Sequence, residues 1–170
     1  NIAIGKDALR ANVTGASITA IGTYALHSNT IGNNTAVGAT SLYSNTTGFY
    51  NTGLGINTLY YNTTGTRNAA IGDLALFNNL SATSSVAVGY NAAAGAAAYN
   101  NQGGVYVGYQ SGNNVTTGSD YNTFLGYQSG YGVTTGSNNI WIGTATSSTA
   151  IANLTTGSQN IIIGNNISLP

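Results

Sequence analysis

Residues 51–72 read NTGLGINTLYYNTTGTRNAAIG and contain the motif that decides the fold. The pattern Asn-x-x-aliphatic-Gly occurs at residues 51–55 and again at residues 68–72, so its closing glycines, Gly55 and Gly72, lie 17 positions apart. The same aliphatic-Gly pair recurs along the whole chain, at Gly5, Gly22, Gly38, Gly55, Gly72, Gly89, Gly108, Gly126, Gly143 and Gly164. A short, regular period of this kind is typical of solenoid proteins.

Each repeat contains one short strand. Counting from each glycine as position 0, position −1 is always aliphatic and position −4 is Asn in seven of the ten repeats. Thr-Gly corners such as Thr63-Thr64-Gly65 separate the strands, and a repeat of about 17 residues is too short for a helical hairpin. The sequence therefore predicts an all-β, parallel β-solenoid of about ten coils, with strands stacked about 4.8 Å apart.

Asparagine occupies two rows of this repeat. One row is position −4, and the second is position +7 in the first five coils, at Asn12, Asn29, Asn45, Asn62 and Asn79. Identical side chains on successive coils lie directly above one another, and an amide can both donate and accept hydrogen bonds along the stack. We expect both rows to form buried Asn ladders.

Large and small residues exchange places along the array. In the first five coils position −2 is Ala or Gly and position +4 is Leu, whereas later coils carry Tyr106, Phe124 and Trp141 at −2 with Gly112, Gly130 and Ser147 at +4. Packed cores conserve volume, so positions −2 and +4 are predicted to fill the interior together. The single array, residues 1–170 of a longer fibre, then divides into Leu-filled coils (1–84), an irregular junction coil (85–104) and aromatic-filled coils (105–170).

The opposite strand face forms an apolar stripe. Position −1 is aliphatic in every coil, which a soluble monomer rarely leaves exposed. We predict that copies of the chain cover this stripe, with a subunit interface at Ile21, Val37, Leu54, Ile71, Val88, Val107, Leu125, Ile142 and Ile163.

Charge is too sparse for most chemistry. Only 4% of the residues are charged, three basic and three acidic, so no basic patch for nucleic acid can form. The single His and the three Asp fall in separate coils, and we predict no catalytic, metal or cofactor-binding residues and no enzyme activity. No apolar run approaches the roughly 20 residues of a membrane span, so no membrane contact is expected in this segment.

Aromatic side chains form two rows that are candidates for surface contacts. Tyr43, Tyr60 and Phe77 stand at position +5, and Tyr90, Tyr109 and Tyr127 at position +1. Rings with a polar tip suit a host-surface glycan or protein. The alternative, which we favour, is that they shield the coil edges or the seam between subunits.

Particular segments resemble known repeats. Residues 85–95, SVAVGYNAAAG, resemble the head repeat of YadA-type trimeric autotransporter adhesins, and residues 122–130, NTFLGYQSG, are similar to phage tail-fibre repeats. This resemblance implies a left-handed β-roll that associates as a homotrimer and serves attachment at a cell or virion surface. The Leu at +4 and the Thr-Thr-Gly corner depart from the adhesin repeat, which leaves the coil shape open.

These observations predict a structural and adhesive rod segment of an extracellular fibre, either a cell-surface adhesin or a phage tail fibre. Its main partner is expected to be itself, and open strand edges in the first and last coils are expected to favour end-to-end filaments. One alternative is an ice-binding or other surface-binding solenoid, which requires outward Thr pairs on a strand. Another is the stalk of a glycan-degrading tail spike, which requires clustered carboxylates.

Overall fold

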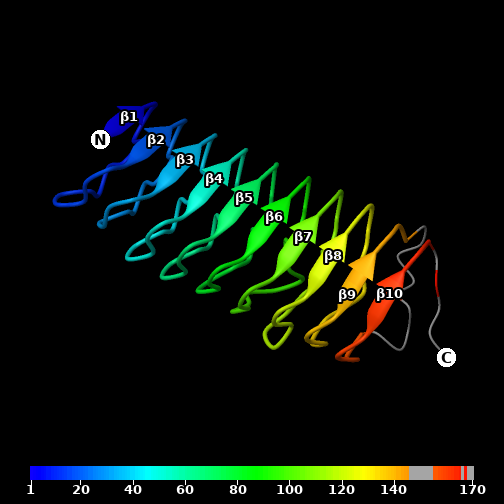
Figure 1. Cartoon of the computed structure of the whole chain (residues 1–170). Coiled ribbons are helices and arrows are strands. Elements are labelled where there is room, and N and C mark those ends of the chain that lie inside the picture. The colour runs from blue at the N-terminus through cyan, green and yellow to red at the C-terminus, as the bar shows by residue number, and fades with distance from the viewer. Residues whose placement is uncertain (146–154, 166, 168–170) are drawn as a thin grey trace.

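The structure is a computed structural model that describes residues 1–145, 155–165 and 167. Figure 1 shows successive coils with their strands in one row along a single wall. The strands are β1 (Ile2–Ile4), β2 (Thr19–Ile21), β3 (Thr35–Val37), β4 (Thr52–Leu54), β5 (Ala69–Ile71), β6 (Val86–Val88), β7 (Val105–Val107), β8 (Thr123–Leu125), β9 (Ile140–Ile142) and β10 (Ile161–Ile163). The described residues contain no helix, and the predicted parallel β-solenoid is confirmed. Coils are numbered below by their strand.

All ten strands form one parallel sheet in sequential order, β1 to β10. The register sets equivalent repeat positions side by side: Thr35 pairs with Thr52, and Val37 pairs with Leu54. Backbone hydrogen bonds between coils continue beyond the strands, for example from the Leu42 N–H to the Thr58 carbonyl at 2.9 Å. Each coil is therefore bonded to the next along much of its contour.

The closing glycine of each repeat is required by close backbone contact. These ten glycines have φ between 117° and 146°, a range that L side chains rarely adopt. A Cβ added to Gly55 would lie 2.8 Å from the carbonyl carbon of Gly72 in the next coil. The aliphatic-Gly pair thus marks the point where successive coils approach most closely.

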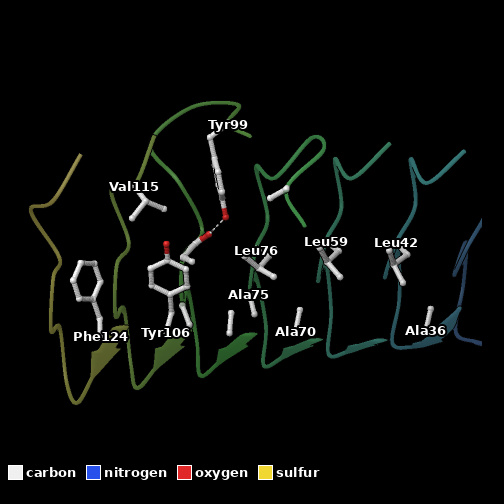
Figure 2. Packing of buried hydrophobic residues seen from close by; sticks show 14 of the residues in the cluster. Ala36, Leu42, Leu59, Ala70, Ala75, Leu76, Tyr99, Tyr106, Val115 and Phe124 are labelled. Carbon is white, nitrogen blue, oxygen red and sulfur yellow. Dashed lines mark hydrogen bonds between the residues drawn. The ribbon is translucent and has the colours of Figure 1, made fainter. Parts of the chain in front are cut away.

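The middle residue of each strand points into the coil. From β2 onward this position is buried, and the leucines at +4 in coils 2 to 5 are buried opposite it (Figure 2). A Cβ added to Gly112 would lie 2.5 Å from Cδ1 of Tyr106, and one added to Gly130 would overlap the ring of Phe124. Positions −2 and +4 therefore share one interior space, as predicted. Ala3 in the first coil is exposed, and Ser147 lies outside the described residues.

The leucines at +4 have an unusual backbone conformation. Leu26, Leu42, Leu59 and Leu76 have φ between 50° and 54°, in the left-handed region. This region costs a residue with a side chain about 1 to 2 kcal/mol. In the aromatic-filled coils Gly112 and Gly130 adopt φ of 59° and 63°, where glycine has no steric penalty.

Both rows of asparagine form ladders. In the −4 row, Asn51 accepts a hydrogen bond at its Oδ1 from the backbone N–H of Asn68 at 3.1 Å, and its Nδ2 donates to the Gly65 carbonyl at 2.7 Å. In the +7 row, Nδ2 of Asn62 donates to Oδ1 of Asn45 at 2.7 Å. These side chains are buried, and the +7 ladder runs through Asn29, Asn45 and Asn62. Asn12 and Asn79 instead accept a hydrogen bond within their own corners, and Oδ1 of Asn62 and Nδ2 of Asn79 have no partner among the described residues. The predicted ladders are therefore confirmed for the −4 row and for the middle of the +7 row.

Candidate functional site

The first and third side chains of each strand point out of the coil and together form what we call the outer strand face. In β5, Ala70 is 0% exposed whereas the following residue, Ile71, is 42% exposed. The predicted interface residues all lie on this face. Val37, Ile71, Leu125, Ile142 and Ile163 are exposed, and Ile21, Leu54, Val88 and Val107 are half-buried.

The outer strand face is apolar along its whole length. Of its 20 side chains, 16 are aliphatic and the other four are Thr19, Thr35, Thr52 and Thr123, so it carries no charge. The strand N–H and C=O groups pair within the sheet, so the face offers a partner mainly apolar surface. A continuous surface of this kind is suited to burial against another protein surface.

Two flanks border the outer strand face. We define the leading flank as the residues two positions before each strand, and the trailing flank as the residues two positions after it. Coil 5 carries opposite charges on them, with Arg67 on the leading flank and Asp73 on the trailing flank. The Arg67 guanidinium carbon lies 5.6 Å and 5.7 Å from the ring centroids of Phe49 and Tyr50. Oδ1 of Asp73 is buried and has no hydrogen-bond partner among the described residues.

The aromatic row at +5 is a continuous stack in coils 2 to 5. His27 and Tyr43 have ring centroids 4.9 Å apart, Tyr43 and Tyr60 are 5.1 Å apart, and Tyr60 and Phe77 are 5.5 Å apart. Stacked rings cover each other's faces, so mainly edges and hydroxyl groups are directed outward. Burial, then interaction with Tyr43 and Tyr61, raises the pKa of Tyr60.

The aromatic row at +1 is a second stack, on the trailing flank. Tyr90 and Tyr109 have ring centroids 5.5 Å apart, and Tyr109 and Tyr127 are 5.2 Å apart with ring planes within 8° of parallel. All three rings are exposed. This stack begins in the coil after Asp73, so the trailing flank becomes aromatic over coils 6 to 8.

Two tyrosines are fully buried in the junction and aromatic-filled coils. The Tyr99 hydroxyl donates to the Ala93 carbonyl at 2.5 Å (Figure 2), and the Tyr106 hydroxyl donates to the Ser119 carbonyl at 3.5 Å. Burial raises the pKa of both side chains, and the nearby charge of Asp120 adds to the increase for Tyr106. The sequence did not identify Tyr99 as a core residue, because the irregular coil lacks the repeat pattern.

Corner threonines add a third axial ladder that the sequence analysis missed. The Thr30 hydroxyl donates to the Thr46 carbonyl at 2.9 Å, and the Thr46 hydroxyl donates to the Thr63 carbonyl at 3.0 Å. A threonine in a turn is usually explained by local backbone preference, so its type alone did not signal bonding between coils. The recurrence of Thr one residue after the +7 Asn was the available signal.

Groups able to perform acid-base or metal chemistry are dispersed. In the part of the chain that the structure describes, no three His, Cys, Asp or Glu side chains gather as a metal site, and no helix could cross a membrane. Oδ1 of Asp120 accepts a hydrogen bond from the Gln102 N–H at 2.9 Å, which assigns it a structural contact. Comparisons with protein-family models, with curated proteins and with solved structures find no match to this chain.

Proposed function

We propose that the chain is a rod segment of an extracellular fibre, and that copies of the chain bury the outer strand face against one another. The observation that carries this proposal is the uncharged outer strand face, which continues over all ten strands. The interior is already filled, and the Asn ladders form their hydrogen bonds within one chain. The outer strand face is the extended apolar surface left for a partner.

The architecture suits a load-bearing rod. Ten coils spaced about 4.8 Å apart give a length of roughly 45 Å. Strand hydrogen bonds, Asn ladders, Thr ladders and ring stacks all run along that axis, so an axial pull is shared among many bonds. The resemblance to YadA-type heads and phage fibres favours a homotrimer with left-handed coils, and attachment at a cell or virion surface as the role.

The aromatic stacks are the candidate contacts for a host-surface glycan or protein. Their exposed edges and hydroxyl groups could meet such a surface, although the stacking leaves few free ring faces for sugars. We favour the interpretation that the rings protect the coil edges and the subunit seam. Burial of tyrosine in such a seam uses both its apolar body and its polar tip.

The two alternative functions find less support. The outer strand face has a Thr column at Thr19, Thr35 and Thr52, but an aliphatic residue is the other outward side chain on each of those strands. An ice-binding face built from outward Thr pairs therefore does not arise on them. A tail-spike stalk that cleaves glycans would need paired carboxylates, whereas Asp7, Asp73 and Asp120 belong to coils 1, 5 and 8.

The proposal is tested by placing charge on the outer strand face. The double variant Ile71→Asp/Val88→Asp should weaken assembly strongly, because an unpaired carboxylate buried in an interface costs several kcal/mol. Light scattering measures the mass of the assembly in solution. The matched control Thr47→Asp/Thr64→Asp adds the same charge to exposed corner residues and should leave the mass unchanged. An Ile71→Asp/Val88→Asp protein that stays fully assembled would rule out this face as the interface.

A further inference from the structure

Coil 5 is distinctive because its two flanks carry opposite charges, neither of which forms an ion pair in the part of the chain that the structure describes. Arg67 is exposed and lies against the rings of Phe49 and Tyr50, which leaves the edges of its guanidinium group free. Asp73 is half-buried, and its shielded Oδ1 lacks a hydrogen bond. A desolvated carboxylate oxygen is unfavourable unless a donor reaches it. The rest of the half-buried side chain is accessible, so a positive charge placed beside this carboxylate by another copy would offset part of that cost.

We propose that Arg67 of one copy pairs with Asp73 of the next copy, in a cyclic assembly whose rods are parallel and in register. The inference rests on the proposed burial of the outer strand face between copies. It goes further by fixing the relative direction of the rods, their axial register and a specific contact. An Arg–carboxylate pair of this kind provides geometric specificity at an otherwise apolar seam.

Symmetry explains why an Arg67–Asp73 contact reveals whether neighbouring rods are parallel or antiparallel. When the rotation axis runs parallel to the rods, the leading flank of each copy meets the trailing flank of its neighbour at the same coil. When the rods are antiparallel and face each other about a two-fold axis, leading flank meets leading flank at every register. Arg67 could then never meet Asp73. The opposite charges on opposite flanks therefore favour the parallel arrangement.

Other coils match in the same register. In coil 4 the exposed Tyr50 of the leading flank would meet the exposed Ile56 of the trailing flank. In coil 7 the trailing Tyr109 would face Gly103, beside which the ring of Tyr121 from the next coil already lies. Both combinations therefore set exposed hydrophobic side chains against one another. The tyrosine stack on the trailing flank would then lie in the seam.

Charge reversal tests the pair. Arg67→Glu and Asp73→Arg should each raise the dissociation constant of the assembly by about tenfold or more, because each variant sets like charges against one another. The double variant Arg67→Glu/Asp73→Arg restores opposite charges across every seam and should return the constant close to that of the unmodified chain. Native mass spectrometry over a dilution series gives the constants, and Trp141 fluorescence checks that each variant is folded.

The outcomes separate this inference from the proposed function. Suppose that the unmodified chain assembles, but that Arg67→Glu/Asp73→Arg binds no more tightly than the two single effects added together predict. The Arg67–Asp73 pair is then wrong, and burial of the outer strand face stands. If the unmodified chain is a single molecule at every concentration, both are wrong. The milder pair Arg67→Gln and Asp73→Asn gives the same test without introducing repulsion.

Cysteine cross-linking provides an independent check, because the natural chain contains no cysteine. An Arg67→Cys chain mixed with an Asp73→Cys chain should form disulfide-linked species under mild oxidation, whereas either variant alone should not. Cross-linking of a single variant with itself would place like flanks together and overturn the parallel arrangement. The double variant Arg67→Cys/Asp73→Cys should close a covalent ring, and the number of chains in that ring is read from a non-reducing gel.

Discussion

Residues 1–84 and residues 105–145 build the same wall of strands but fill the coils from opposite sides. In the first region Leu59 and Leu76 extend toward the strands, where the inward residue is Ala or Gly (Figure 2). In the second region Tyr106 and Phe124 extend from the strands toward the wall that leucine occupied. The strand register continues unchanged through the junction. The comparison shows that the backbone of the coils sets the interior volume. Side chains at either position −2 or position +4 can fill that volume.

The two regions also differ in backbone strain. Leucine at +4 is held at a left-handed φ, and its buried side chain offsets the cost of that conformation. In the aromatic-filled coils the residue at +4 no longer supplies packing, and glycine is present at the same φ in Gly112 and Gly130. Two effects therefore favour Gly over Leu at +4 in the aromatic-filled coils. The aromatic ring at −2 leaves no room for a leucine side chain, and glycine has no steric cost at this φ.

The largest effect is expected when leucine is placed in the aromatic-filled region. In Gly130→Leu the new side chain would occupy the position of the Phe124 ring, at a φ of 63° that disfavours leucine. Overpacking and backbone strain together should lower the free energy of unfolding by about 2 to 5 kcal/mol. Urea denaturation measures the change.

The control for this substitution is Gly118→Ala. Gly118 has a φ of 96°, and a Cβ there would have no atom within 4 Å, so only the backbone cost should appear. Equal losses of stability in the two variants would show that packing against Phe124 is unimportant.

A second, smaller difference should appear at alkaline pH. The pKa values of Tyr99 and Tyr106 are raised in the folded chain, chiefly by burial, so the unfolded chain loses these protons first. Stability is then complete below about pH 10 and declines above it, by up to about 1.4 kcal/mol per pH unit for each tyrosine. Urea unfolding, followed by fluorescence of the buried Trp141, should show this decline.

Single phenylalanine variants distinguish these tyrosines from the exposed ones. Tyr99→Phe and Tyr106→Phe should each reduce the alkaline dependence, whereas Tyr50→Phe, which alters an exposed ring in the Leu-filled region, should not. Residues 1–84, all of which the structure describes, contain no fully buried tyrosine. The raised pKa of the half-buried Tyr60 leaves a smaller alkaline loss in Tyr99→Phe/Tyr106→Phe, so a loss as large as in the unmodified chain would contradict the assignment.

The smallest effect is expected from the energetic coupling between positions −2 and +4 of one coil. Ala70→Phe introduces a ring into space that Leu76 fills, and the companion change Leu76→Gly should relieve part of the damage. The coupling energy should be about 1 kcal/mol or more, from a double-mutant cycle of unfolding free energies. Strictly additive changes in the free energy of unfolding would show that the side chains at positions 70 and 76 do not share interior space.

The sequence predicted the parts of the fold that depend on repetition. The glycine period placed every strand, the exchange of Leu76 and Phe124 identified the inward face, and the Asn rows indicated ladders such as Asn45 to Asn62. These features are visible because stacking repeats the same physical requirement in each coil. The apolar outer strand face could be predicted for the same reason.

Other features could not be predicted because side-chain type did not reveal them. Leu59 has no preference for a left-handed φ, and the conformation follows from the path of the coil. The buried serine and threonine at position +3, such as Ser41 and Thr58, look like surface residues in the sequence but share a 2.6 Å hydrogen bond inside the coil. Tyr99 lies where the period fails, so no row indicated its burial.

The mass of the unmodified chain in solution shows whether copies of the chain bury the outer strand face against one another. One chain has a mass of 17.2 kDa, and burial of the outer strand face in a homotrimer predicts a species of three times that mass in native mass spectrometry. That species should persist on dilution and at high salt, because apolar contacts dominate the proposed interface. A single species of 17.2 kDa at every concentration would contradict the account.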